Sequence, residues 1–164
     1  MTRLSKLSRS LHGRVAIVTG AGSGMGRATA HLLGDEGAKV AVVDVNRDGV
    51  DRVAGELAAA GYPAKGYVAD LSDPAQIEAL VPQVRADLGP IDIVVNNAGV
   101  SIPTTLTAQG WEDAWALTFE VNLTAQARLI RACHEDLTRA ELAADGGGRV
   151  VNIASTEEIG RAHV

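Results

Sequence analysis

Short apolar runs alternate with helix-like patterns along the whole chain. The strand-like runs are Arg14–Thr19, Lys39–Val43, Ala64–Ala69, Ile91–Val95 and Arg149–Ala154. Apolar residues recur at helical spacing over Gly24–Glu36, Arg47–Ala60, from Asp73 towards Leu88, and through most of Gly110–Ala144. Continuous apolar runs are typical of strands buried on both faces. The alternation predicts an α/β fold with a doubly wound, Rossmann-like parallel sheet of five strands and right-handed crossovers.

The helix that begins after Asp73 has clear start signals. Asp73 is placed to act as the N-cap, Pro74 suits the first helical position, and Gln76 can reach back to the cap. Pro82 lies inside this helix, lacks a backbone donor and crowds the Glu78 carbonyl. The sequence therefore predicts a kink or a break near Pro82.

The pattern shows no internal repeat and no boundary between domains. Residues 1–12 are interpreted as a short leader, because they lack the continuous apolar stretch of a secretory signal. Residues 13–164 are interpreted as one dinucleotide-binding domain. In such a sheet the ligand lies at the carboxyl ends of the strands, where the strand order reverses between the first and fourth strands.

A glycine-rich segment, Thr19–Gly26, links the first strand to the first helix. Its spacing fits T-G-x-x-x-G-x-G on Thr19, Gly20, Gly24 and Gly26, and fits neither G-x-G-x-x-G nor a P-loop. Glycines let the backbone approach a pyrophosphate, and the free N–H groups of the helix N-terminus attract its charge. The alternative is an ordinary glycine-rich turn.

The second strand ends in a carboxylate, Asp44. A carboxylate at this place can accept hydrogen bonds from both hydroxyls of an adenosine ribose and repels a 2′-phosphate. Ser23 and Val45 supply no cation for such a phosphate, although Arg47 could swing towards it. The sequence therefore favours NAD over NADP; the alternative role for Asp44 is an N-cap of the next helix.

The third and fourth strands also end in polar residues. Asp70 could accept from the adenine amine while Leu71 packs on the ring; alternatively, Asp70 begins a turn with Ser72 and Asp73. Asn96–Gly99 (Asn96, Asn97, Ala98, Gly99) supplies donors, acceptors and a close backbone approach at the reversal point, the alternative being an Asx turn.

Composition narrows the function classes. The chain has 164 residues, 46% apolar, and a formal net charge of −5, so no basic field points to nucleic acid or to an anionic membrane. No apolar run approaches the length of a membrane span. One cysteine, Cys133, gives no disulfide framework and fits a reducing cytoplasm. The four histidines are scattered and make no metal-ligand spacing.

Taken in order, these motifs resemble the short-chain dehydrogenases/reductases, in the compact branch that carries T-G-x-x-x-G-x-G. The resemblance implies NAD-dependent hydride transfer between nicotinamide and a small secondary alcohol or ketone. It implies catalytic roles for Ser155, which orients the substrate oxygen, and Asn122, which supports a proton-relay water. The implied cofactor residues are Gly20, Ser23, Gly24, Met25, Gly26, Asp44, Asp70, Leu71, Asn97, Ala98 and Gly99. The helix near Trp111–Ala144 resembles one that pairs subunits in the family, which leaves a homo-oligomer open.

The chain departs from the family pattern at the catalytic base. The family uses Tyr-x-x-x-Lys, in which the lysine lowers the tyrosine pKa. The only tyrosines here, Tyr62 and Tyr67, are followed four positions later by Gly66 and Leu71. We interpret the chain as a C-terminally truncated member that lacks the later strands of the family fold and is inactive by itself. The alternatives are a non-catalytic dinucleotide-binding module and a fragment that folds only in part.

Overall fold

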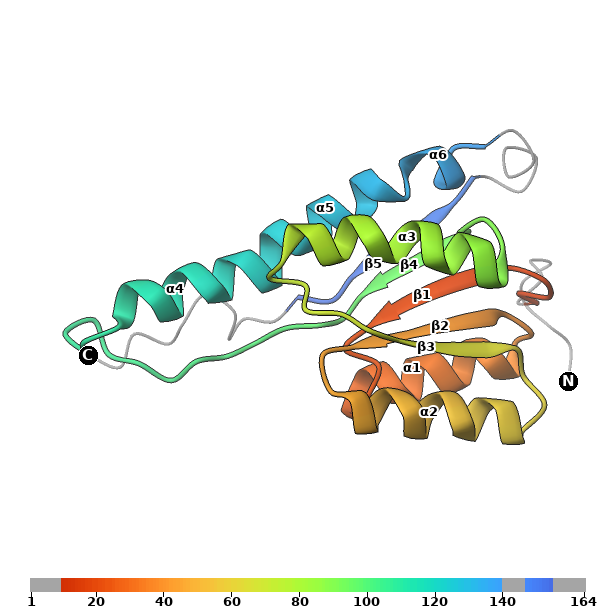
Figure 1. The fold of residues 1–164 in the computed structure, drawn as a ribbon, viewed down its shortest axis with the longest axis horizontal. Coiled ribbons are helices and arrows are strands. Elements are labelled where there is room, and N and C mark those ends of the chain that lie inside the picture. The colour runs from red at the N-terminus through yellow and green to blue at the C-terminus, as the bar shows by residue number, and fades with distance from the viewer. Residues whose placement is uncertain (1–9, 140–146, 155–164) are drawn as a thin grey trace, which may run out of the picture.

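The computed structural model describes residues 10–139 and 147–154, and its centre is a five-stranded parallel sheet (Figure 1). The strands are β1 (Val15–Thr19), β2 (Lys39–Asp44), β3 (Ala64–Val68), β4 (Ile93–Asn96) and β5 (Arg149–Asn152), in the order β3-β2-β1-β4-β5. The predicted fold class is confirmed. The reversal also lies where the sequence places it, because β1 pairs with both β2 and β4.

Helices cover both faces of the sheet. They are α1 (Gly24–Asp35), α2 (Arg47–Ala59), α3 (Pro74–Leu88), α4 (Trp111–Phe119), the π-helical turn η1 (Glu120–Thr124), α5 (Ala125–Ala132) and α6 (His134–Leu137). Figure 1 shows α1 and α2 on one face and α3, α5 and α6 on the other. Within the described residues, no helix is long and apolar enough to cross a lipid bilayer.

Alternation along the strands divides the apolar side chains between two cores. Val15 and Ile17 of β1 face the core that contains Ile77, Leu80 and Leu129 from α3 and α5. The next side chains along β1, Ala16 and Val18, face the other core, with Ala30 and Leu57 from α1 and α2. Both faces of β1 are therefore dry, which explains why its sequence is a continuous apolar run.

All five strands differ from the predicted bounds by one or two residues at an end, and β4 and β5 differ the most. β4 begins at Ile93 instead of Ile91, because the Asp92 carboxylate turns onto the Val15 N–H and the β1–β4 ladder starts at Ala16 and Ile93. β5 ends at Asn152 instead of Ala154; the last backbone bond from this segment to β4 is from Ile153 N to Asn96 O.

Of the two long helical segments, the one with the internal proline differs from prediction. The break predicted at Pro82 does not occur, since α3 continues to Leu88 while Leu80, Val81 and Val84 stay buried on both sides of the proline. The packing of this buried face offsets the lost backbone hydrogen bond. The helix predicted through most of Gly110–Ala144 is confirmed from Trp111 to Ala132, where α4, η1 and α5 follow one another without a break, and α6 comes after Cys133; Gly110 is the N-cap of α4.

A buried carboxylate joins separate elements at the amino end of the sheet. Asp92 is 4% exposed, accepts from the Val15 N–H at 2.7 Å and pairs with the guanidinium groups of Arg14 and Arg139. Nearby, Asp136 accepts from Ile91 N at 3.1 Å and from Arg85 Nε at 3.1 Å. These bonds tie β1, β4 and α6 together far from the carboxyl ends of the strands.

We expect Asp92→Asn to destabilise the chain by about 2–3 kcal/mol, because two arginines lose their shared anion and the amide matches their donors poorly. Urea denaturation followed by circular dichroism measures the change. Asp51→Asn on the exposed surface of α2 is the control and should leave the midpoint in place. Equal midpoints for the two variants would refute the structural role of Asp92.

Candidate functional site

A cavity of about 610 Å³ lies at the carboxyl ends of the strands, the end to which the arrowheads point in Figure 1. All of the cofactor residues expected from the sequence line it: Gly20, Ser23, Gly24, Met25, Gly26, Asp44, Asp70, Leu71, Asn97, Ala98 and Gly99. Val45, Ala69, Ser72, Val100, Leu117 and Val121 complete the lining. The volume lies within the ~300–1,000 Å³ typical of small-molecule sites.

The glycine loop fits against the end of β4 without room for side chains. A Cβ at Gly20 would lie 2.9 Å from Ala98 Cα and from the Asn97 amide nitrogen. A Cβ at Gly26, inside α1, would overlap the Gly20 carbonyl. These two glycines therefore serve close packing of loop, helix and strand end.

Thr19 and Asn97 lock this junction with hydrogen bonds. The Thr19 hydroxyl accepts from Asn97 N and Ala98 N, both at 3.0 Å. The Asn97 amide nitrogen donates to the Thr19 carbonyl at 2.9 Å and to the Gly20 carbonyl at 3.3 Å. Asn97 thus bridges two segments, and the Asx-turn alternative does not describe its side chain.

Asp44 joins the glycine loop to the end of β2. Its Oδ2 accepts from Gly22 N at 2.9 Å and its Oδ1 from Asn46 N at 2.9 Å. The N-cap of α2 is Asn46, whose side chain accepts from Gly49 N, so the alternative role of Asp44 as N-cap is wrong. The carboxylate lines the cavity and keeps lone pairs that can accept further hydrogen bonds.

Asp70 and Leu71 each have a structural role as well as a place in the cavity wall. Asp70 Oδ1 accepts from both the backbone and the hydroxyl of Ser72, at 2.9 and 2.7 Å, so the predicted turn exists. Leu71 is 9% exposed and belongs to the core under α3. Neither fact removes these residues from the cavity, which both of them line.

The N-terminus of α1 faces the cavity, and no acidic side chain in its first turn offsets the positive end of the helix dipole. Its N-cap is Ser23, whose side chain makes no capping bond, and its first turn contains no acidic residue. Ser23, Gly24 and Met25 are exposed and line the cavity. Unpaired N–H groups and the positive end of the helix dipole can hold an anion such as a diphosphate.

One buried polar atom at the site lacks a partner. Asn97 Oδ1 is buried and accepts no hydrogen bond within the described part of the chain. An unsatisfied buried acceptor is costly, and a hydroxyl or amide donor from a bound molecule would satisfy it. Together with the exposed helix N-terminus and Asp44, this orphan acceptor fits a dinucleotide, which offers phosphates and sugar hydroxyls.

The two residues with expected catalytic roles have different outcomes. Asn122 lies in η1 and is buried; its amide accepts from Val100 N at 2.8 Å and donates to the Val100 carbonyl at 2.9 Å. It therefore holds a segment of the cavity wall, and its part in a proton relay stays a prediction. Ser155 lies outside the described residues.

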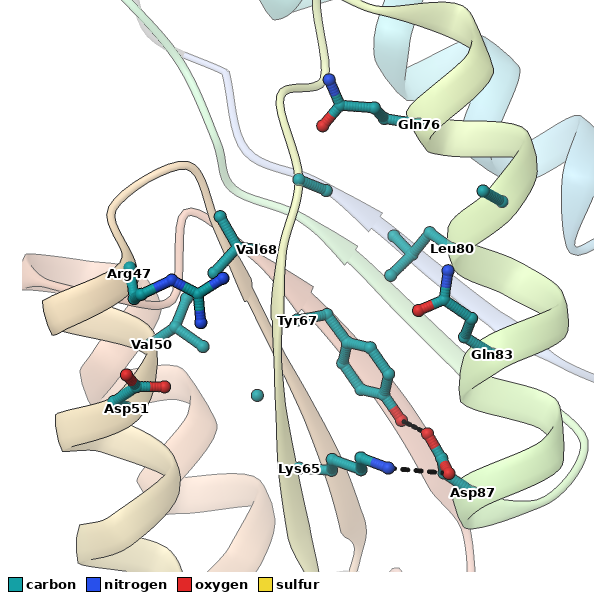
Figure 2. A pocket seen from close by; sticks show the side chains of 13 residues that line it. Arg47, Val50, Asp51, Lys65, Tyr67, Val68, Gln76, Leu80, Gln83 and Asp87 are labelled. Atoms are coloured by element: carbon teal, nitrogen blue, oxygen red, sulfur yellow. Dashed lines mark hydrogen bonds and ion pairs between the residues drawn. The ribbon is translucent and has the colours of Figure 1, made fainter.

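Neither tyrosine is placed to act as a base in this cavity. Tyr67 lines a separate groove of about 360 Å³ between α2 and α3, where its hydroxyl donates to Asp87 at 3.0 Å and Lys65 pairs with the same carboxylate (Figure 2). Burial and the bond to Asp87 raise the pKa of Tyr67. The hydrogen bond to Asp35 likewise raises the pKa of Tyr62. A catalytic phenol needs the opposite shift.

Two contributors to the site were missed from the sequence. The sequence identifies Thr19 only as part of the glycine motif. In the structure its hydroxyl accepts from the backbone N–H groups of Asn97 and Ala98 and so fixes the start of that segment. Arg52 on α2 donates to the Gly22 carbonyl at 2.7 Å. An arginine on an exposed helix face carries no sequence signal for such a contact, because the partner is 30 residues away.

The described residues offer no metal centre. They contain no group of three histidine, cysteine, aspartate or glutamate side chains arranged to hold an ion. Cys133 is fully buried, and burial, with a smaller contribution from Asp136, raises the pKa of its thiol to about 12, which makes it unreactive.

Comparison with known proteins places this geometry in a family. Residues 14–163 match the family described as short chain dehydrogenase. D-threitol dehydrogenase of Mycolicibacterium smegmatis is 35% identical over 159 residues, which are 94% of this chain and 59% of that protein. The 2,3-dihydro-2,3-dihydroxybenzoate dehydrogenase of Bacillus subtilis is 38% identical over 71% of this chain and 44% of its own length.

Similarity to solved structures supports the same family assignment. A blue fluorescent protein from a metagenomic library, in complex with NADPH, superposes with a TM-score of 0.81 at 34% identity, over 93% of this chain and 61% of that one. A putative NAD(P)-dependent gluconate 5-dehydrogenase from Beutenbergia cavernae with bound NADP gives 0.77 at 37% identity, over 91% and 57% of the two chains. The chain thus spans 44% to 61% of the length of these relatives. It belongs to the short-chain dehydrogenase family.

Proposed function

We propose that this chain binds NAD in the cavity at the carboxyl end of the sheet, as the cofactor-binding part of an oxidoreductase of the compact T-G-x-x-x-G-x-G branch. The observation that carries the proposal is the convergence of the glycine loop, Asp44 and the orphan acceptor Asn97 Oδ1 on one cavity. The bound nicotinamide would supply the hydride donor or acceptor for a small secondary alcohol or ketone. Ser23, Gly24 and Met25 would face the diphosphate, and Asp44 the adenosine ribose.

The choice of NAD over NADP rests on charge at the ribose end of the cavity. The relatives with solved structures hold NADPH and NADP, so the comparisons do not disfavour NADP. In this chain the Gly22 N–H is bound by Asp44, which lines the cavity, and the Gly22 carbonyl by Arg52, which does not line it; Ser23 and Val45 are neutral. Arg47 lines the groove over β3 instead of this cavity, as Figure 2 shows. A 2′-phosphate would meet a carboxylate, which supports a preference for NAD.

A non-catalytic dinucleotide-binding module is the second candidate. The observation that favours it is the position of both tyrosines, which have raised pKa values and lie outside the cavity lining. Assembly of copies through α4 and η1 is a further proposal: Trp115 and Phe119 of α4 and Leu123 of η1 are 44%, 38% and 60% exposed, and a partner could cover them.

Replacing Gly24 tests whether the loop holds a diphosphate. Gly24 has a φ of +50°, and a Cβ added there would meet no atom within 4 Å, so Gly24→Ala adds a methyl group that only a ligand would contact. Gly61→Ala is the matched control, since Gly61 has a φ of +86°, equally open surroundings and a position away from the cavity. Both variants should lose about 1 kcal/mol of stability. Only Gly24→Ala should lose NAD affinity in calorimetric titration; equal affinities would contradict the phosphate role.

Asp44→Asn tests the cofactor preference. The substitution keeps one oxygen for the Gly22 N–H, loses the acceptor for Asn46 N and removes the negative charge, so the ratio of NAD to NADP affinity should fall about tenfold. Competitive titration of both dinucleotides against the unaltered chain provides the reference. Tighter binding of NADP than NAD by the unaltered chain would sink the assignment.

The 164-residue chain should show no alcohol oxidation. A positioned acid–base group typically contributes ~10²–10⁴ in rate, and Tyr67 is held in another groove with a raised pKa. NADH formation is followed by absorbance with a panel of secondary alcohols. Tyr67→Phe is the control: turnover by the unaltered chain that this variant loses would show that Tyr67 reaches the nicotinamide after all.

A further inference from the structure

Helix α2 binds the glycine loop through a side chain. Gly22 is buried, and its carbonyl accepts from the Arg52 guanidinium at 2.7 Å while its N–H donates to Asp44 at 2.9 Å. One loop residue is thus bound by an anion on its donor and by a cation on its acceptor. Charge-assisted hydrogen bonds of this length are stronger than neutral ones.

Helix α2 also packs closely against the glycine loop at Gly49. A Cβ at Gly49, in the first turns of α2, would lie 2.9 Å from the Gly22 carbonyl oxygen and 3.0 Å from its Cα. Gly49 N is in turn held by the Asn46 side chain at 2.9 Å. The Gly22 carbonyl therefore points towards α2, because the Arg52 guanidinium binds it and Gly49 has no room for a Cβ beside it.

This orientation has a consequence for the next donor along the chain. In a trans peptide the carbonyl and the N–H point in opposite directions, and the structure contains no cis peptide bond among its described residues. With the Gly22 carbonyl fixed towards Arg52, the Ser23 N–H of the same peptide points away from α2. Ser23 lines the cavity, so this donor belongs to the set that an anion at the start of α1 would use.

We propose that Arg52 is a positioning residue for dinucleotide binding: it orients the Gly22–Ser23 peptide without touching the cofactor. Arg52 is absent from the cavity lining, which separates this role from direct contact. The inference rests on the proposed NAD site. It adds a residue from a different helix, and it predicts that the diphosphate end of the site depends on α2.

Arg47 provides a matched control on the same helix. It carries the same charge, is also exposed, and lines the groove over β3 with no hydrogen bond or ion pair to the described residues (Figure 2). Arg47→Met and Arg52→Met therefore remove equal charge from α2, but only the second removes a bond to the loop. Arg52→Lys keeps the charge and one donor, although it cannot reproduce the planar fork.

The test combines affinity with local exchange. Loss of a hydrogen bond from a charged donor at a partly exposed site is expected to weaken NAD and ADP-ribose about tenfold in Arg52→Met. Arg47→Met should bind both as the unaltered chain does, and Arg52→Lys should recover part of the loss. In the absence of any nucleotide, amide hydrogen exchange at Gly22, whose N–H is bonded to Asp44, should quicken in Arg52→Met and not in Arg47→Met.

The outcomes separate the two proposals. If the unaltered chain fails to bind NAD, the proposed function fails, while the exchange measurement still tests the hold of Arg52 on the loop. If NAD binds to the unaltered chain and equally well to Arg52→Met, the positioning role is overturned and the proposed function stands. A loss that Arg47→Met shares, or that Arg52→Lys does not relieve at all, also overturns it.

Discussion

The close contact between the glycine loop and the end of β4 is the feature that makes the rest of the site possible. Neither Gly20 nor Gly26 has room for a Cβ, and the Asn97 side chain binds the Thr19 and Gly20 carbonyls across the gap. This contact can form only because β1 and β4 are neighbours, with Val18 and Val95 in register. It brings the start of α1 and the Asn97–Gly99 segment to the same cavity.

The charged groups that stabilise the fold and the groups that could bind a ligand lie at opposite ends of the sheet. The buried charges of Asp92 and Asp136 are paired with arginines at the amino end of the sheet. At the carboxyl end the helix N-terminus is open and Asn97 Oδ1 is buried without a partner in the described part of the chain. Unsatisfied polar groups at a site lower the stability of the free protein. A ligand that satisfies them recovers that free energy as binding affinity.

Several residues at the site perform two tasks, which limits what a single substitution can reveal. Asp44 holds Gly22 and Asn46 and also faces the cavity; Asn122 holds Val100 and comes from the π-helical turn. Removing either side chain would change the backbone as well as the chemistry. Variants that keep the shape, with controls of equal strain or charge, are therefore the informative ones.

Local patterns in the sequence were enough to predict the fold class and the strand order at the reversal point, and the family resemblance that the motifs carry implied the residues that the cavity brings together. Periodicity and glycine spacing are local properties, and parallel strands carry their ends to one edge. Folding in three dimensions settled the rest: Pro82 leaves α3 unbroken, Asp44 is not an N-cap, Tyr67 lies in a different groove, and Arg52 holds Gly22. These outcomes depend on contacts between segments distant in the chain, whose packing energy outweighs local preference and leaves no periodic trace.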